Sequence, residues 1–536
     1  GHLDVAETLL ERVYARDQKL ADQQLAQRAF ALAEISELKL DYPKATARYQ
    51  EVTQRQPDNF TAWQNLALLA QKQGNTSQAL QAWQQLQQNV SQTLEPAVYI
   101  TALLGEGDIL FLQERNAEAL KVYQTAVTAS RTWHDKQPDK GRASELLASS
   151  LLSLGKLQFS DDPKQALATV EESIKWHTTL QQQSPDDVQR QRDLAVALSS
   201  AGELYRSHGD LNAAQRAHQD ALKWREKLLA SAKDNLQWQR DVFVSVSNMA
   251  LVEGALGNDA AVLPLLQRAD TLSQQLTQRD PHNREWQRDR SILLERLATA
   301  YSAKADQPAA LKAQQEAWAI TQALAKLDPD NQQWQRDFVT TGETLREFYQ
   351  ASDDNKALGA LLAAVIPVQQ RLVDLEPDNL EQKTALYLNY GRLGETHQLQ
   401  NDNRAALQAY QQALELNQQL AAAKPDVSAF RGEIATNLNR IGAAHFALKD
   451  NAKALAAFEE ALTLFTPLAK AEPAVVEWQL GIVGSKYQMA QIVADQHDAL
   501  LQEAIAILEK LQQEKRLPDA YKTWPEEMRK ELKKPS

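Results

Sequence analysis

Residues 185–232 read PDDVQRQRDLAVALSSAGELYRSHGDLNAAQRAHQDALKWREKLLASA, and this stretch decides the fold. Small and apolar residues recur three and four positions apart on both sides of the central HGD, which is the spacing of one helix face. The stretch therefore predicts two antiparallel helices of about 20 residues, each roughly 30 Å long, joined by a tight turn.

The same unit recurs along the chain at a constant 48-residue period. Prolines that precede the unit mark this period at Pro281, Pro329, Pro377, Pro425 and Pro473. A fixed period of this kind is typical of repeat architectures. Upstream the period shortens, since the equivalent positions Ala45 and Ala79 delimit a 34-residue unit. We therefore expect a graded array whose units lengthen along the chain.

Polar residues mark the ends of the expected helices. Side-chain oxygens that can cap the first helix of a unit stand at Asp187, Asn235, Asn283, Asn331 and Asn379. Short turn formers stand between the paired helices at Gly209-Asp210, Gly257-Asn258, Asn401-Asp402 and Lys449-Asp450. These signals predict the helix boundaries from the chemistry of caps and turns.

Small and aromatic residues at fixed packing positions give the chain a family resemblance. They are Trp63, Leu66, Ala79 and Trp83 in an early unit, and Gly202, Tyr205, Ala214, Ala221, Gly394, Ala406, Tyr410, Ala413, Gly442, Ala454, Phe458 and Ala461 in later ones. The pattern resembles the tetratricopeptide repeat, in an extended 48-residue variant like the long arrays of large bacterial proteins. The resemblance implies an all-α fold, an α-solenoid of about eleven antiparallel helix pairs in a right-handed superhelix.

The predicted organisation follows the period. We expect a partial helix from a truncated repeat at residues 1–22, two 34-residue units at 23–93, two transitional units at 94–184, seven 48-residue units at 185–516, and a capping segment and tail at 517–536. The opening Gly1-His2 is typical of a segment excised from a longer protein.

The motif WQRD recurs at Trp238–Asp241, Trp286–Asp289 and Trp334–Asp337, with QRD alone at Gln191–Asp193. It stands at the repeat period near the start of each first helix. We interpret it as a structural staple, in which Trp covers the preceding helix end and Arg and Asp bridge neighbouring units. The next unit holds Gln382–Ala385 there, so this chemistry changes.

Composition excludes several classes of function. The net charge of −12 disfavours nucleic acid and anionic membranes, because both are bound by Lys and Arg. The absence of Cys removes disulfides, Cys-based zinc sites and thiol catalysis. No signal peptide and no membrane span is predicted. We expect a cytoplasmic protein, and the periplasm is the alternative.

Catalytic motifs are absent from the sequence. It contains no HExxH, no P-loop and no GxSxG, and no strand pattern that could carry the last two. We therefore expect no enzymatic activity, no metal site and no cofactor. His397 and His445 share one repeat position and are interpreted as packing residues.

The inner surface of the array is the remaining candidate site. In proteins with this resemblance the first helices line a groove that binds a partner. The equivalent exposed positions are Glu203, Arg206, Glu295, Arg296, Glu343, Glu347, Arg392, Glu395, Asn439 and Arg440. The alternative is that these side chains are solvated or form salt bridges between adjacent helices.

Two functions follow from this reading. The first is a protein-interaction scaffold, the docking or sensor arm of a larger bacterial protein that binds a polypeptide in the groove and carries an effector module elsewhere. The alternative is a regulatory receptor whose small ligand is held between the C-terminal repeats. Ligand screening by thermal shift separates them, because a ligand that binds only the folded chain raises its stability.

Overall fold

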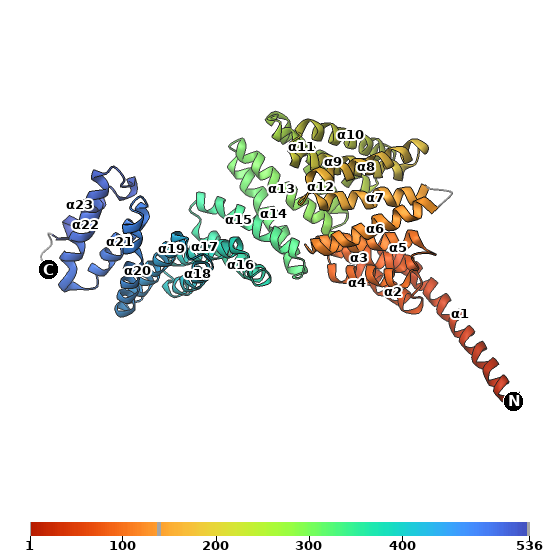
Figure 1. Ribbon diagram of the computed structural model, residues 1–536, viewed down its shortest axis with the longest axis horizontal. Coiled ribbons are helices and arrows are strands. Elements are labelled where there is room, and N and C mark those ends of the chain that lie inside the picture. The colour runs from red at the N-terminus through yellow and green to blue at the C-terminus, as the bar shows by residue number, and fades with distance from the viewer. Residues whose placement is uncertain (1, 137–140, 533–536) are drawn as a thin grey trace. The chain divides into compact units, whose positions relative to one another are not determined.

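The computed structural model describes residues 2–136 and 141–532, and for residues 2–15, 17 and 18 the backbone alone. Within these ranges the regular structure is helical (Figure 1). The early helices are α1 (His2–Leu38), α2 (Tyr42–Arg55), α3 (Phe60–Gln73), α4 (Thr76–Asn89), α5 (Pro96–Leu112), α6 (Asn116–Lys136), α7 (Gly141–Gln158) and α8 (Pro163–Gln183).

The later helices are longer and more regular. They are α9 (Val188–His208), α10 (Leu211–Ser231), α11 (Leu236–Ala255), α12 (Asp259–Arg279), α13 (Arg284–Ala303), α14 (Gln307–Leu327), α15 (Gln332–Ala351), α16 (Asn355–Leu375), α17 (Leu380–Leu399), α18 (Asn403–Ala423), α19 (Ser428–Ala447), α20 (Asn451–Ala471), α21 (Val476–Ala490), α22 (His497–Gln513) and α23 (Trp524–Leu532). In the described part of the chain α1 to α22 make eleven successive pairs, which confirms the predicted solenoid.

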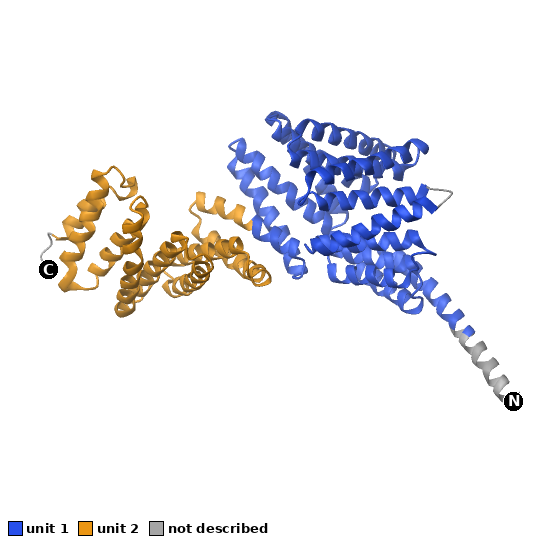
Figure 2. Cartoon of the chain, in the orientation of Figure 1, with its two compact units in different colours: residues 1–341 blue, residues 342–536 orange. Residues whose placement is uncertain are grey.

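Two compact units divide the chain, residues 1–341 and residues 342–536 (Figure 2). We call them unit 1 and unit 2. The division falls inside α15, within the run of 48-residue repeats, where the sequence carries no boundary signal. Each unit is built from the same helix pairs, so the division reflects how repeats contact one another rather than a change of fold.

The predicted caps and turns are confirmed. The side chain of Asn235 accepts a hydrogen bond from the amide of Trp238 at 3.1 Å, and Asn331 accepts one from Trp334 at 3.1 Å. Gly209 has a φ of +90°, a left-handed conformation that glycine adopts without strain. The helix ends are therefore fixed by the local residues, as the repeat pattern indicated.

A glycine in the first helix, packed against a ring in the second, joins the two helices of several pairs. A Cβ on Gly394 would lie 2.4 Å from the ring of Tyr410, and one on Gly442 would lie 2.6 Å from Phe458. The rings of Tyr410 and Phe458 are fully buried. This close approach explains why the repeat needs a small residue at the signature position.

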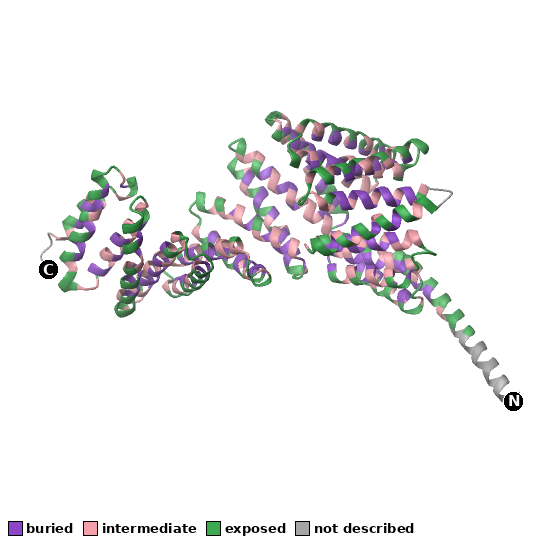
Figure 3. Ribbon diagram, viewed as in Figure 1, coloured by how far each residue is buried: buried purple, intermediate pink, exposed green. Residues whose placement is uncertain are grey.

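Buried residues line the inward-facing sides of the helices, and neighbouring pairs share them (Figure 3). One cluster runs from Ala26 in α1 to Ile109 in α5, and another from Val242 in α11 to Ala317 in α14. The core is therefore a chain of contacts between successive helices, as expected for a solenoid.

Two helices of the structure, α1 and α16, differ from what was predicted from the sequence. Helix α1 is continuous over 37 residues and passes through the boundary predicted at residue 22, because residues 2–42 contain no Gly or Pro to interrupt it. Helix α16 is long and apolar enough, by length and composition alone, to cross a membrane, although no span was predicted. Half of the relevant window of α16 is buried inside the fold, which accounts for its apolar character.

Helix α23 lies in the segment 517–536 that was predicted to cap the array. Helix α23 buries Met528 against α22 and neighbouring residues, so it covers the last pair. The basic end of the tail, residues 533–536, lies outside the described residues.

Candidate functional site

The WQRD segments form a ladder of ion pairs along unit 1. Arg192 contacts Asp241 at 2.6 Å, and Arg240 contacts Asp289 at 2.6 Å. Each Arg thus binds an Asp of the next repeat, one position beyond the 48-residue period. Burial opposes the charge of Arg240, but the carboxylate of Asp289 outweighs it, and the pKa of Arg240 is raised. The predicted bridging role is confirmed.

The Gln of the motif has a role that the sequence reading missed. Gln239 donates to the carbonyl of Lys233 at 2.7 Å, and Gln287 donates to that of Pro281 at 2.5 Å. The side chain therefore ties the first turn of the helix to the loop that precedes it. In both cases the Gln stands six residues after the position of the proline. This constant spacing was the signal in the sequence that could have predicted the contact.

The ladder ends on an early repeat. Arg288 pairs with Asp337 at 2.5 Å, but the position that should supply the next Asp, for Arg336, is Ala385. Arg336 instead contacts Glu114, just after α5, at 2.8 Å. The last rung therefore joins repeats that are far apart in sequence.

Further contacts surround the ion pair of Arg336 with Glu114. They join residues 42–114 to residues 280–336, and we call this region of contact the seam. The Tyr42 hydroxyl donates to Asp280, and Gln71 donates to Glu285 at 3.0 Å. The indole of Trp334 lies directly over Gly74, where a Cβ would come within 1.9 Å of the ring. The seam closes unit 1 on itself, so its repeats do not form an open-ended row.

Four of the predicted groove residues lie in unit 1, and three of them, Glu203, Glu295 and Arg296, bridge adjacent repeats. Glu203 accepts a hydrogen bond from the Asn248 amide at 2.7 Å, and Glu295 accepts one from the Thr341 hydroxyl at 2.7 Å. The charges of Glu203, Glu295 and Arg206 all act on Arg296. Burial lowers the pKa of Arg296, Glu203 acts in the opposite direction, and Arg206 lowers it further. The four residues therefore share one electrostatic environment.

The other six predicted residues lie in unit 2, and four of them are used between repeats, namely Glu343, Glu395, Asn439 and Arg440. Glu343 accepts hydrogen bonds from Asn389 and from Arg346. Glu395 pairs with Arg440, and Asn439 donates to the Gly481 carbonyl and accepts from Ser485. Glu347 is exposed beside Arg346, and Arg392 donates to Asn389. Most of these polar groups thus already have partners in the fold. Their binding of another molecule stays a prediction.

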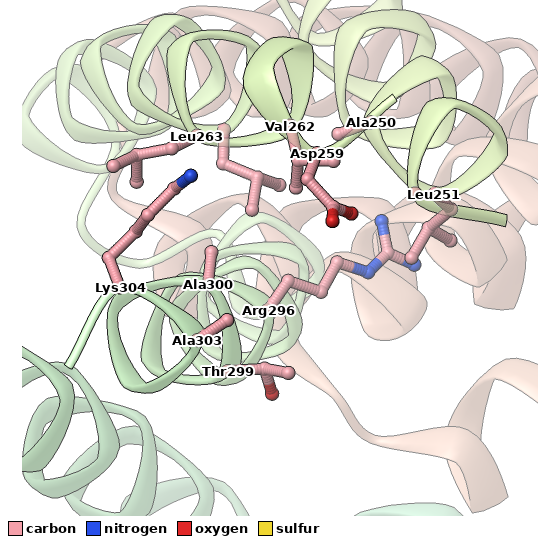
Figure 4. A pocket seen from close by; sticks show the side chains of 12 residues that line it. Ala250, Leu251, Asp259, Val262, Leu263, Arg296, Thr299, Ala300, Ala303 and Lys304 are labelled. Atoms are coloured by element: carbon pink, nitrogen blue, oxygen red, sulfur yellow. The ribbon is translucent and has the colours of Figure 1, made fainter. Parts of the chain in front are cut away.

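A cavity of about 360 Å³ lies between α11, α12 and α13. Its walls are mostly apolar, and they are made by Ala250, Leu251, Gly254, Asp259, Val262, Leu263, Leu266, Arg296, Thr299, Ala300, Ala303 and Lys304. Figure 4 shows Arg296 reaching from α13 toward Asp259 of α12, with Lys304 on the other side of the pocket. We call this cavity the middle pocket.

Small residues at two repeat positions open the middle pocket. Gly254 stands where the preceding repeat has Arg206, and Ala300 stands where it has Val252. A Cβ on Gly254 would meet only Val262, at 3.5 Å, so space remains beside it. This pocket was not predicted from the sequence. The replacement of larger side chains by Gly and Ala at these two repeat positions was the signal that could have located it.

Arg296 is the predicted groove residue that reaches the middle pocket. Among the described residues its guanidinium makes one hydrogen bond, from Nη1 to the Ser247 hydroxyl at 2.6 Å. A guanidinium has five N–H donors, so most of them are free to bind a ligand. The pocket thus combines an apolar wall with a fixed cation.

Groups that could hold a metal ion are not found in the described part of the chain. Burial lowers the pKa of His177 and, together with Arg225 and Arg206, that of His218, in each case to about 4. Both imidazoles are therefore neutral at physiological pH and fill space between helices. The arrangement offers binding surfaces built from packed helices.

Paired helices, the glycine–ring contacts and the inter-repeat bridges define the class of this protein as a tetratricopeptide-type α-solenoid. The tetratricopeptide repeat family model matches residues 388–420 and 435–465, which confirms the predicted resemblance. A second model, described as the TT21 fifth ARM repeats domain, matches residues 27–136. Repeat families of this kind are generally non-enzymatic interaction scaffolds.

Solved structures with a similar repeat include three that cover much of the chain. Yeast Tom70 is 14% identical with a TM-score of 0.29, covering 95% of this chain and 96% of its own. The human IFIT1 dimer with PPP-AAAA is 16% identical with a TM-score of 0.32, covering 84% and 94%. Rap protein complexed with Competence and Sporulation Factor is 13% identical with a TM-score of 0.43, covering 69% and 94%. None of the curated proteins matches the chain in sequence.

Proposed function

We propose that the chain is a docking scaffold for a polypeptide and that the middle pocket receives one apolar side chain of this partner. In the same proposal Arg296 binds a carboxylate next to that side chain. The observation that carries it is an apolar cavity with a partly free guanidinium at its edge.

The size of the middle pocket supports this proposal. Its volume of about 360 Å³ fits one large aliphatic or aromatic side chain and part of the adjoining backbone. Sites that bind small groups are usually apolar clefts with a few placed polar groups, which is the arrangement here. Apolar area gives affinity, at roughly 25 cal/mol per Å² buried, and the polar group sets orientation.

The charge of the lining supports an acidic partner. Arg296 and Lys304 contribute two positive charges and Asp259 one negative charge, so the lining is net positive in a chain of net charge −12. A carboxylate beside the bound side chain can accept two parallel hydrogen bonds from a guanidinium. Such a carboxylate belongs to Asp, Glu or a C-terminal residue.

Selection from a library of random peptides with free C-termini tests the proposal. We expect the enriched peptides to place an apolar residue next to a carboxylate. The variant Ala300→Leu introduces a side chain of the size found at Leu204, the same repeat position two units earlier. It should weaken the binding of the selected peptides about tenfold or more, since it fills the cavity. Peptides that bind this variant as tightly as the unchanged chain would contradict the proposal.

A second variant tests the role of Arg296. Arg296→Met keeps most of the side-chain length but removes the charge, and it should weaken carboxylate peptides while leaving their amidated forms unaffected. The matched control is Arg216→Met on α10, an exposed Arg outside the pocket, which should change neither. If the screen instead enriches nothing while free amino acids raise the melting temperature, a small-ligand receptor is favoured.

The remaining parts of the proposal concern the cell. By the resemblance of the 48-residue repeat to the long arrays of large bacterial proteins alone, we propose that the scaffold acts in the cytoplasm as the docking arm of such a protein with an attached effector module. Size analysis of the native gene product, with sequencing of whatever adjoins the array, tests this part.

A further inference from the structure

A second cavity, of different chemistry, lies in the C-terminal cap of unit 2. Its volume is about 180 Å³, and it is lined by Tyr487 of α21 and by Trp524, Glu527, Met528 and Glu531 of α23. We call these five residues the cap cage. Two aromatic rings and two carboxylates thus face one space, and none of the five lining residues is a Lys or Arg.

The aromatic rings of the cap cage are held in place. The ring centroids of Tyr487 and Trp524 are 6.3 Å apart, with the planes tilted by 41°. Tyr521 packs edge-on against Trp524, with ring centroids 4.9 Å apart, and gives the indole a second aromatic contact. Met528 is 2% exposed and anchors the helix that carries the cage. The cage is therefore preorganised before any ligand enters.

The carboxylates of the cap cage differ in their surroundings. Glu531 accepts hydrogen bonds from the Tyr487 hydroxyl and from Gln491, both at 3.1 Å, so it is oriented by the fold. Glu527 is exposed, so its side chain is accessible to a ligand. Burial, followed by the charge of Glu531, raises the pKa of Tyr487, so its hydroxyl stays protonated and donates to Glu531.

Two nearby cations are engaged elsewhere. Arg529 on the same helix pairs with Glu509 of α22, and Lys486, the neighbour of Tyr487, pairs with Glu503. The negative charge of the cap cage is therefore not neutralised by these two residues. The π face of an aromatic ring attracts a cation within about 6 Å of its centroid, and a carboxylate adds to this attraction.

We propose that the cap cage binds an alkylated ammonium group. The aromatic rings of the cap cage favour a weakly hydrated cation such as trimethylammonium over a bare ammonium, because a ring face does not replace the water that an ammonium loses, and the carboxylates attract either cation. The site is independent of the middle pocket, because it lies in the other unit and selects the opposite charge.

Calorimetric titration of the whole chain with choline and with 3,3-dimethylbutan-1-ol tests the proposal. The two probes have the same shape and differ in charge. We expect choline to bind about threefold to thirtyfold more tightly, the range that a cation–π contact gives. Equal binding of the two probes would show an apolar cavity only, and no saturable binding of choline would overturn the proposal outright.

Variants on α23 localise the effect and keep the test decisive. Glu527→Gln should weaken choline binding severalfold, and Glu526→Gln, an equal loss of charge at an exposed neighbour, should leave it unchanged. Equal effects of these two variants would contradict the assignment. Trp524→Phe should weaken binding as well, with circular dichroism to verify that the cap remains folded. Peptides carrying trimethyl-lysine or unmodified lysine then show whether the cage takes the cation from a polypeptide or as a free small molecule.

Discussion

Unit 1 and unit 2 use the same 48-residue repeat but connect their repeats differently. In unit 1 the Arg–Asp ladder runs from repeat to repeat and ends on Glu114, across the seam. In unit 2 the bridges join neighbours through varied pairs, such as Glu395 with Arg440 and Asn439 with Ser485. The residues that recur in every repeat therefore specify the helix pairs, whereas residues that differ between repeats specify how far the superhelix winds.

The largest expected effect compares one Trp position in both units. Trp334 lies on Gly74 across the seam, and Trp478, three periods later, packs on Gly432 in unit 2. Replacing either by Ala should cost about 3–5 kcal/mol, since both are buried. Only Trp334→Ala should also raise hydrogen exchange in residues 42–76. Equal exchange in the two variants would show that the seam does not hold unit 1 closed.

Acid should destabilise unit 1 through His218. Burial lowers its folded pKa to about 4, below the 6.5 of an unfolded His, so the unfolded chain binds more protons between these values. The contribution is present above pH 6.5 and is lost as pH falls toward 4, by roughly 3 kcal/mol in total.

At the repeat position of His218, two repeats of unit 2 carry Tyr410 and Phe458, and neither side chain titrates between pH 4 and 6.5. His218→Phe should therefore remove this part of the acid sensitivity, measured by urea unfolding at several pH values. An unchanged pH profile in this variant would assign the acid sensitivity to other groups.

Two glycines should respond to Ala in opposite directions. Gly394→Ala in unit 2 forces a Cβ against the buried Tyr410 ring and should cost about 1–3 kcal/mol. Gly254→Ala in unit 1 meets no close atom and should be neutral or stabilise by up to about 1 kcal/mol. Thermal unfolding of both variants checks the pair, and a loss in Gly254→Ala would show that the middle pocket is smaller than described.

The smallest expected effect concerns the last rung of the ladder. The side chains of Arg336 and Glu114 are each 28% exposed, so their ion pair should contribute about 0.5–1 kcal/mol. A double-mutant cycle with Arg336→Met and Glu114→Gln measures this coupling, and high salt should reduce it. A coupling near zero would leave the packing of Trp334 as the main support of the seam.

The elements of the fold could be predicted because their signals are local and periodic. Asn235 and Asn331 mark helix starts, and the spacing of Arg240 from Asp289 marks the ladder. The seam could not be predicted, because contact between Gly74 and Trp334 depends on small rotations that accumulate over several repeats. Of the residues that line the two cavities, only Arg296 was among the predicted site residues. The cap cage lies where the period stops, so no repeat position pointed to it.

The last rung of the ladder also bears on how this array could have evolved. A linear repeat protein can gain or lose a unit by duplication or deletion, because every unit meets only its neighbours. Deleting one 48-residue unit between Glu114 and Arg336 would remove a step of the winding and carry Arg336 away from its acid. We therefore expect the closed part of the chain to keep its number of repeats, and lineages of this protein to vary in repeat count only outside residues 42–336.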